Sequence, residues 1–220
     1  MKKKQMQFAV IGIGRFGSSV ARSLNKLGYE LLIIDNDEAR IQEMVDSATH
    51  AVQIDSTDEQ TLKAVGIRNF DVAIVAIGEN IQASILTTIV LKDLGVKRVI
   101  VKARNDLHAK VLEKLGADRV VHPERDMGER LVHQIISPNI LDYIELEEDY
   151  SIGEIIASEW MIGKTMRQLD IRAKFGCNVM AIKSGHKVNV SPRAEDVIQQ
   201  KDLLIVIGHN DDLRRLDRNE

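Results

Sequence analysis

The sequence predicts an α/β protein in two parts: a doubly wound parallel sheet, followed by a small α+β domain. Over roughly the first 120 residues, short apolar runs alternate with segments of helical periodicity, as in repeated βαβ units. The apolar runs have no polar face, which is typical of parallel strands covered by helices on both sides. From residue 144 onward the chain changes to short strands with few helices, which indicates a second domain.

Each element of the first part has local signals at its ends. A glycine follows most helical runs, where a left-handed C-cap is expected, and an Asp or Asn precedes most of them as an N-cap. The expected strands are 8–11, 31–34, 51–54, 72–77, 99–101 and 120–121, and the expected helices are 18–27, 38–48, 59–65, 81–94 and 107–115. The C-cap glycines are Gly28, Gly66, Gly95 and Gly116, and the N-caps are Asp37, Asp58, Asn80 and Asp106.

A helix is expected to begin near Pro123 and to carry apolar residues at Met127, Leu131 and Ile135. Pro138 and Asn139 interrupt it, and we expect it to continue over 140–143. A broken helix after the last strand predicts a crossover that leaves the sheet as a linker, a dimer arm, or both. We therefore place the first domain at 1–137, and the linker with the second domain at 138–220.

The second domain has about 75 residues from Ile144 onward, which is marginal for independent stability, so it is expected to dimerise. Its expected strands are 152–156, 179–182, 188–190 and 203–207, and its expected helices are 164–169 and 211–216.

A glycine-rich turn joins the first strand to the first helix. In this Gly-x-Gly-x-x-Gly motif, Gly12 permits the tight turn, Gly14 lets the backbone approach a phosphate, and Gly17 lets helix and strand pack closely. Asp35 ends the second strand, close to the spacing of about 20 residues expected of an acid that binds a ribose hydroxyl. The motif in this context predicts a Rossmann-like adenine-nucleotide site, against the alternative of a tight turn that binds nothing.

Composition limits the classes of function. The 220 residues are 44% hydrophobic and 29% charged, which allows a real core in a soluble chain. A net charge of −3 and 4% aromatic residues offer neither a general attraction to nucleic acid nor stacking platforms for bases. The single cysteine, Cys177, excludes an intramolecular disulfide and fits a reducing compartment. The longest apolar runs have the length of strands, so we expect a cytoplasmic protein that reaches a membrane only by docking.

Several polar residues are candidates for the nucleotide site. Arg15, inside the glycine loop, suggests a ligand with more negative charge than a dinucleotide, such as one with a β- or γ-phosphate; the alternative is a solvated arginine. Asp55 and Ser56 follow the third strand, near the crevice, or serve as an acidic N-cap. Phe16, which follows Arg15 in sequence, and Asn36, which follows Asp35, are also expected to belong to the site.

The ends of the later strands supply further candidates. Ala76, Ile77 and Gly78 could let an adenine or ribose lie against the backbone, or simply form a turn. Lys102, like Arg104, could reach phosphate or be a surface cation. Glu124 could help hold a hard cation beside nucleotide phosphates, although on spacing alone a salt bridge or a helix N-terminal acid is favoured.

Catalytic motifs are missing from the sequence. The histidines show no paired ligand spacing, and there is no Gly-x-x-x-x-Gly-Lys-Ser/Thr loop, Gly-x-Ser-x-Gly elbow or His-Glu-x-x-His motif. The C-terminal segment offers no recognisable proton donor for a dehydrogenase. Nucleotide binding without catalytic equipment favours a sensor over an enzyme.

Three segments of the first domain carry a resemblance to a known family: residues 8–17 (FAVIGIGRFG), 75–84 (VAIGENIQAS) and 116–126 (GADRVVHPERD). In the second domain, residues 169–176 (LDIRAKFG) and 202–208 (DLLIVIG) continue it. Nearly the whole chain resembles the regulatory subunits of bacterial Ktr-type potassium-uptake systems. These carry an RCK (regulator of potassium conductance, or KTN) domain followed by an RCK C-terminal domain.

The resemblance implies a cytoplasmic gating-ring subunit, not an enzyme. It implies a homo-octameric ring, a tetramer of dimers, on the inner face of a membrane-embedded potassium translocator. ATP and ADP would bind the glycine loop and favour different ring shapes, with ATP activating. Arg15 matches the family's loop arginine, which contacts the terminal phosphates. Glu124 matches the acid that helps bind an activating cation, Mg²⁺ or another ion, near them.

The resemblance also implies an inhibitory effector, cyclic di-AMP, at a dimer interface of the second domain. The matching region contains Ile171, Arg172, Ala173, Lys174, Asn178 and Pro192. Two rival functions remain at this point. A small NAD-dependent oxidoreductase would prefer NADH over ATP, and a nucleotide-sensing transcription regulator would need a basic DNA-reading helix, which no segment resembles.

Overall fold

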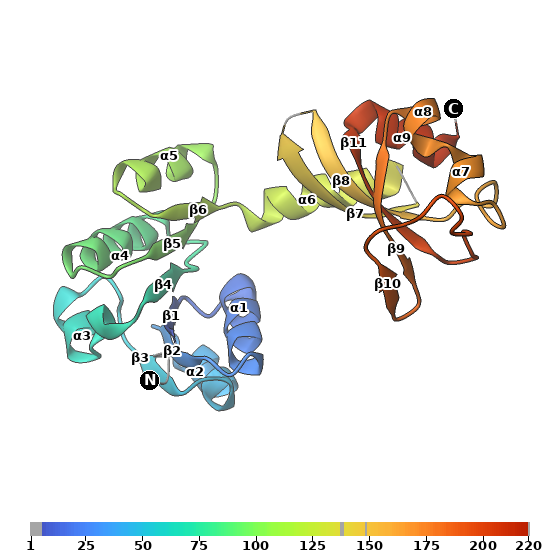
Figure 1. The fold of residues 1–220 in the computed structure, drawn as a ribbon. Coiled ribbons are helices and arrows are strands. Elements are labelled where there is room, and N and C mark those ends of the chain that lie inside the picture. Colours follow the sequence, from blue (N-terminus) through green and yellow to red (C-terminus); the bar gives the residue numbers. More distant parts are fainter. Residues whose placement is uncertain (1–5, 137–138, 148, 220) are drawn as a thin grey trace. The chain divides into compact units, whose positions relative to one another are not determined.

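The computed structural model describes residues 6–136, 139–147 and 149–219, and Figure 1 shows its elements in chain order. The chain forms two compact units, Met1–Pro123 and Glu124–Glu220, which are described separately below. The expected domain boundary between residues 137 and 138 lies outside the described residues and stays a prediction.

The first unit is a six-stranded parallel sheet with the strand order β3-β2-β1-β4-β5-β6. Two halves of the sheet wind outward from β1 and β4, which confirms the predicted doubly wound fold. The strands are β1 (Gln7–Ile11), β2 (Glu30–Asp35), β3 (His50–Gln53), β4 (Val72–Val75), β5 (Val99–Lys102) and β6 (Arg119–Val121). The α-helices between them are α1 (Arg15–Lys26), α2 (Glu38–Met44), α3 (Glu59–Ala64), α4 (Ile81–Asp93) and α5 (Asp106–Lys114).

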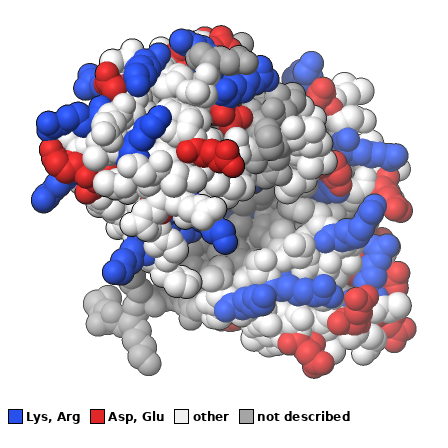
Figure 2. Space-filling view, turned by 90° about the vertical axis from the view of Figure 1, so that its right-hand side faces the viewer, with Lys and Arg blue, Asp and Glu red and all other residues white. Residues whose placement is uncertain are grey.

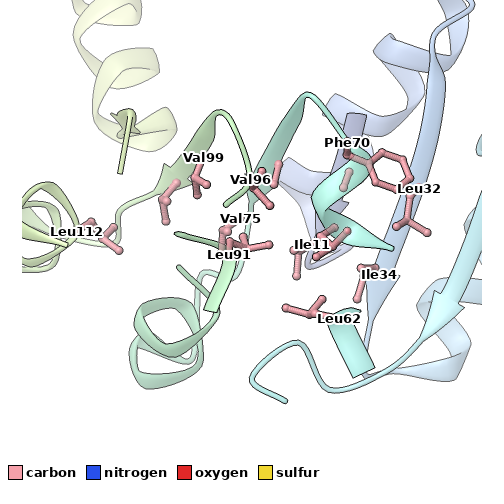
Figure 3. Close-up of a cluster of buried hydrophobic side chains, with 14 of the residues drawn as sticks. Ile11, Leu32, Ile34, Leu62, Phe70, Val75, Leu91, Val96, Val99 and Leu112 are labelled. Atoms are coloured by element: carbon pink, nitrogen blue, oxygen red, sulfur yellow. The ribbon is translucent and has the colours of Figure 1, made fainter. Parts of the chain in front are cut away.

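Alternate residues of the strands build two cores, one on each face of the sheet. Ala9 and Ile11 of β1 pack with residues of α3, α4 and α5, and Figure 3 shows this larger cluster. Val10, between them in sequence, packs with residues of α1 and α2. Successive side chains of a strand point to opposite faces, so a strand that is apolar throughout is buried on both.

The ends of the helices follow the signals in the sequence, with one difference. Asp37, Asp58 and Asn80 each accept hydrogen bonds from backbone N–H groups in the first turn of α2, α3 and α4. The N-cap of α5 is Asn105, whose side chain accepts from the His108 N–H, while the expected cap, Asp106, lies inside the first turn. The predicted C-cap glycines all have positive φ: Gly28, Gly66, Gly95 and Gly116.

The second unit begins with α6 (Pro123–Ile136) and contains an antiparallel sheet with the strand order β10-β9-β11-β8-β7. Its strands are β7 (Ile140–Glu147), β8 (Tyr150–Ile156), β9 (Asn178–Ser184), β10 (Lys187–Asn189) and β11 (Leu203–His209). Its short helices are α7 (Met166–Leu169), α8 (Ile171–Phe175) and α9 (Asn210–Arg218), and its own core includes Ile155, Met161, Phe175, Leu204 and Leu213.

The prediction that the helix continues over 140–143 is wrong, because these residues belong to β7. This strand pairs antiparallel with the next strand, β8, and forms one edge of the sheet. The short helix α8 was not predicted either. No helix in the described ranges combines the length and the apolar character needed to cross a lipid bilayer.

Candidate functional site at the glycine loop

In the loop between β1 and α1, the first and last glycines pack closely against neighbouring backbone. Gly12 has φ +90°, and its N–H donates to the Ile34 carbonyl over 2.8 Å. A Cβ on Gly12 would lie 3.0 Å from the Ile77 backbone nitrogen, and one on Gly17 would lie 1.9 Å from the Gly12 carbonyl oxygen. The fold itself therefore requires glycine at both positions.

Gly14 differs, because the fold gives no reason for a glycine there. Its backbone is extended, with φ −78°, and a Cβ built on it would meet no atom within 4 Å. The space above Gly14 is open, as expected where a ligand approaches the backbone closely.

The N-terminus of α1 differs from those of the other helices in the first unit. Gly14 is its N-cap and supplies no side-chain hydrogen bond, and the first turn holds no acidic residue. The four helices α2 to α5 each have a side chain that accepts hydrogen bonds from their first turn. The first N–H groups of a helix have no partner within the helix and carry a partial positive charge. In α1 no side chain caps these groups, and Arg15 is the first helical residue, an arrangement that suits an anion.

Asp35 is buried at the end of β2 and binds the glycine loop directly. Its Oδ2 accepts from the Ile13 N–H over 2.6 Å, and its Oδ1 accepts from the Asp37 N–H over 2.9 Å. The guanidinium of Arg40 lies 3.6 Å from Oδ2. Asp35 thus orders the loop, and a carboxylate has further lone pairs for a ribose hydroxyl. The adjacent Asn36 is exposed, and its carbonyl accepts from the Gln53 amide.

Three predicted residues from separate elements come together beside the loop. The Lys102 Nζ, at the end of β5, lies 5.9 Å from the centre of the Phe16 ring, a cation–π distance. The same Nζ would lie 3.5 Å from a Cβ on Gly78. The N–H of Ala76 donates to the Ile11 carbonyl over 2.7 Å, so the end of β4 is fixed against β1. The carboxyl edge of the sheet therefore carries Phe16, Gly78 and Lys102 as one group.

Asp55 and Ser56 have structural partners in the loop after β3. The Thr57 amide and hydroxyl both donate to Asp55 Oδ1, over 2.9 and 2.8 Å, and these bonds hold the pKa of Asp55 below its usual value. The buried Ser56 hydroxyl lies 2.8 Å from that of Thr87 in α4. These contacts explain both residues as loop anchors. Whether either also contacts a nucleotide stays a prediction.

Glu124 lies in the first turn of α6 and is exposed. No group of three or more His, Cys, Asp or Glu side chains within residues 6–136, 139–147 and 149–219 is arranged to hold a metal ion. A cation at Glu124 would therefore need oxygens from another source, such as nucleotide phosphates. Its predicted role stays a prediction.

The candidate effector residues of the second unit differ in exposure. Ile171 is buried in the core, whereas Arg172, Ala173 and Lys174 are exposed on α8. Asn178 is exposed at the start of β9, and Pro192 is half-buried after β10. The exposed part of this group places two cations, Arg172 and Lys174, on one short helix.

Two notable residues of the first unit were not predicted from the sequence: Arg40, which contacts Asp35, and the buried His108. Arg40 lies five positions past Asp35, and that spacing into the next helix was the available signal. His108 is buried in α5; its Nδ1 accepts from the Arg104 N–H over 3.3 Å, and its Nε2 has no hydrogen-bond partner among the described residues. Burial, and then the proximity of His122, lower the pKa of His108.

Surface charge on the side shown in Figure 2 is mixed. Lys and Arg side chains are interspersed with Asp and Glu, and the described residues on this side form no continuous basic surface of the kind that binds nucleic acid.

Comparison with known proteins identifies the family. The family model of the TrkA-N domain matches residues 8–123, and that of the TrkA-C domain matches residues 154–219. The chain is 56% identical over 218 residues to Ktr system potassium uptake protein C of Bacillus subtilis, covering 99% of this chain and 97% of the relative. The chain belongs to this family of Ktr potassium uptake proteins.

Other relatives agree with this assignment. Ktr system potassium uptake protein A of Bacillus subtilis is 46% identical over 214 residues, with 97% of this chain and 96% of the relative covered. Among solved structures, the RCK domain of GsuK has a TM-score of 0.55 at 23% identity, covering 98% of this chain and 46% of that one. At this identity the likeness supports the RCK fold only. Membership of the Ktr family confirms the predicted resemblance and argues against an oxidoreductase.

Proposed function

We propose that this protein is a regulatory subunit of a Ktr-type potassium-uptake system that binds ATP or ADP at its glycine loop. The bound nucleotide biases the shape of a homo-octameric ring, a tetramer of dimers. The ring transmits that bias to a membrane-embedded potassium translocator, against whose cytoplasmic face it docks. The Ktr relatives carry potassium uptake in their names, and this protein would serve the same process.

The observation that carries nucleotide binding is the uncapped N-terminus of α1. Its first turn has neither a side-chain acceptor nor an acidic residue, and the open backbone at Gly14 leads into it. A phosphate placed there would accept the free N–H groups and meet the positive end of the helix dipole. Asp35, on the neighbouring strand, stands where an acid would accept from a ribose hydroxyl.

Cations beside the loop favour a ligand with several phosphates. Arg15 opens α1, and Lys102 lies beside Phe16 and Gly78. A conformational bias requires that two ligands interact differently with the two states, and the γ-phosphate is the difference between ATP and ADP. Glu124 would join Mg²⁺ or another cation near those phosphates. A solved GsuK channel is described as bound to NAD, so NAD or NADH is the competing ligand for this site.

Exposed apolar side chains support self-association. Met127, Leu131 and Ile135 lie four residues apart on α6 and are 61%, 53% and 69% exposed. Residues at this spacing share one face of a helix, and an exposed apolar face of this kind marks an interaction surface. A dimer formed through α6 would be the repeating unit of the ring.

Cyclic di-AMP is proposed as an inhibitory effector of the second unit. The support is family membership together with Arg172 and Lys174, which are exposed on α8 next to the start of β9. Two guanidinium or ammonium groups per subunit suit a ligand with two phosphates shared across a dimer. Ile171 would contribute through its backbone, because its side chain is buried.

The test is a calorimetric titration of the full chain with ATP, ADP and NADH in one buffer. We expect ATP and ADP to bind more tightly than NADH, and Arg15→Ala to reduce the preference for ATP over ADP by roughly tenfold, the value of one charge-assisted contact. Arg22→Ala is the matched control, because Arg22 lies on the same helix and pairs with Glu43. Equal or tighter binding of NADH would contradict the proposal.

A further inference from the structure

A buried pair of hydroxyl groups joins the loop after β3 to the helix α4. Of the loop residues 54–58, which connect β3 to the N-terminus of α3, only Ser56 is buried. Its Oγ lies 2.8 Å from the Oγ1 of Thr87, a residue of α4 that is fully buried. This hydrogen bond therefore fixes the one buried side chain of the loop.

The inner face of α4 is unusually polar, and Thr87 is distinct within it. The buried residues of this helix are Ser84, Thr87, Thr88 and Leu91. The Thr88 hydroxyl donates to the Ser84 carbonyl over 2.7 Å, an ordinary bond within one helix. The Ser84 hydroxyl has no partner in the described part of the chain. Of these three hydroxyls, that of Thr87 is the one whose hydrogen bond reaches a different element.

The bond connects the two halves of the parallel sheet. In the strand order, β3 belongs to the half that winds outward from β1, whereas α4 follows β4 in the other half. Sheets of this kind bind ligands at the carboxyl ends of the strands, where the two halves meet. The same loop is also attached to Asp35, because the Ile54 N–H donates to the Asp35 carbonyl over 3.1 Å. The loop is thus held between the end of β2 and α4.

Stability alone gives no reason for two hydroxyls at this place. A hydrogen bond between buried groups adds little net stability, and an apolar pair of the same shape can be equally stable. A hydrogen bond has a preferred direction, however, which an apolar contact lacks. The pair therefore fixes where Ser56, and with it the backbone of the loop, is placed.

We propose that Thr87 is a positioning residue of the nucleotide site, which acts through Ser56 to hold the loop after β3 in its ligand-binding conformation. The inference rests on the proposed nucleotide site and deepens it. With phosphates at α1 and the ribose near Asp35, the neighbouring β3 lies on the adenosine side of the ligand. Thr87 is fully buried and acts without touching the nucleotide.

The test is a calorimetric titration of the full chain and its Thr87→Val variant with ADP and with ATP. Valine has nearly the shape of threonine but no hydroxyl, so the variant should bind ADP roughly fivefold more weakly, the value of one hydrogen bond. ATP shares the adenosine half and should weaken by the same factor, which leaves the preference for ATP over ADP unchanged. Thr87→Ser keeps a hydroxyl and should restore most of the affinity.

Thr88→Val is the matched control. It is the same substitution at the next position of α4, in a side chain that is equally buried, and it removes a hydroxyl that bonds within the helix. We expect it to change the affinity for ADP by less than about twofold. A loss as large as that of Thr87→Val would show that any polar change on this face is enough, and would contradict the role of Thr87.

A double variant separates position from stability. Thr87→Val leaves the Ser56 hydroxyl unpaired in the interior, whereas Ser56→Ala combined with Thr87→Val leaves neither hydroxyl behind and should regain most of the stability to urea. Ser56→Ala alone breaks the same bond from the other side. Because all three variants lack one and the same bond, we expect them to weaken ADP to the same extent.

The outcomes distinguish the inference from the function on which it rests. Full affinity for ADP in Thr87→Val, recovered affinity in the double variant, or unequal weakening of ADP and ATP overturns the role of Thr87. A larger loss in Ser56→Ala than in Thr87→Val overturns it as well, since the Ser56 hydroxyl would then bind the nucleotide directly. An unchanged protein that binds neither ADP nor ATP overturns the proposed function instead.

Discussion

At the scale of single residues, the three glycines of the loop serve different purposes. A side chain at Gly17 would collide with the Gly12 carbonyl at 1.9 Å, whereas one at Gly14 would meet nothing within 4 Å. The fold thus requires two of the glycines, whereas the third borders open space and is required only under the proposed nucleotide binding.

This difference predicts opposite results for two alanine variants. Gly17→Ala should lower the free energy of unfolding by more than about 2 kcal/mol, because backbone atoms must move to admit the methyl group. Gly14→Ala should change it by less than about 0.5 kcal/mol, since its extended φ suits alanine, yet should weaken ADP binding by at least about tenfold. Urea unfolding and calorimetric titration measure the two effects. Undiminished ADP binding by Gly14→Ala would show that the open backbone is not a phosphate contact.

Cys177 is a packing residue of the second unit. Its side chain is fully buried, and burial raises the pKa of its thiol to about 11. Because the thiolate is the reactive form, we predict that Cys177 does not react with an aromatic disulfide reagent at about pH 8 until the second unit unfolds. The measurement is the rate at which the reagent's aromatic thiol is released, with and without urea.

Gly208 supplies the matched variant for that measurement. A Cβ on Gly208 would lie 2.8 Å from the Cys177 sulfur, so Gly208→Ala should loosen the packing and speed the reaction in the absence of urea. A native thiol that reacts as fast as one in the unfolded chain would contradict the buried position.

At the scale of elements, α5 carries a titratable group inside the fold. The His108 ring accepts from the Arg104 N–H, and burial and His122 lower the pKa of His108 below its usual 6.5. In the unfolded chain the ring binds a proton more readily. Its contribution to stability is therefore fully present above pH 6.5 and is lost as the pH falls through the lower folded pKa.

We predict that His108→Gln flattens the pH dependence of this element. Hydrogen exchange of the α5 amides should speed up between about pH 7.5 and pH 5.5 in the unchanged protein, after correction for intrinsic rates, and less so in the variant. Glutamine can still accept from the Arg104 N–H, so the loop before α5 is preserved. Parallel pH profiles for the two proteins would rule out His108 as the cause.

The elements that the sequence predicted well are those whose signals are local. Alternating strands and helices, Asp37 and Asp58 as caps, and the positive φ of Gly28 and Gly66 all depend on residues within a few positions. The first half of β7, residues 140–143, was mistaken for helix because its identity depends on pairing with β8, and spacing alone does not reveal a partner strand. At α5 two adjacent cap formers compete, and the first of them, Asn105, takes the cap.

In the candidate site, too, only the features with local sequence signals could be predicted. The glycine loop and Asp35 could be predicted because their spacing is fixed by one βαβ unit. The approach of Lys102 to Phe16, and of Arg40 to Asp35, depends on how separate segments fold together. A cation near an acid in sequence does not show which of the two remains exposed, and here it is Arg40.

At the scale of the whole molecule, the described residues form three hydrophobic cores, two in the first unit and one in the second, and leave one helix face apolar and exposed. None of the three cores includes Met127, Leu131 or Ile135 of α6. A chain that stayed monomeric would keep this face in water, at a cost proportional to its area. Assembly is the simplest way to cover it.

Ile135→Glu is therefore predicted to reduce the mass of the assembly. The side chain is 69% exposed within the subunit, so the substitution should leave the subunit's secondary structure intact, while a buried charge would disfavour a dimer contact. Light scattering after size-exclusion chromatography measures the mass. Leu27→Glu, a 70% exposed leucine at the end of α1, is the control. A mass unchanged from the starting protein would exclude α6 from the contact.

The missing cap of α1 has a consequence for which ligand states of the protein are populated. Each of the helices α2 to α5 has a side chain that caps its N-terminus, whereas α1 has none, so under the proposed function a bound ligand would take that place. If the site binds nucleotide as proposed, the nucleotide-free form would be the less stable one and would be rare in a cell that contains ample adenine nucleotide. The regulatory signal would then be the identity of the bound nucleotide, and not whether the site is occupied. The kinetic step that matters for such a subunit is the exchange of one nucleotide for another, and its rate would set how quickly potassium uptake follows the energy state of the cell.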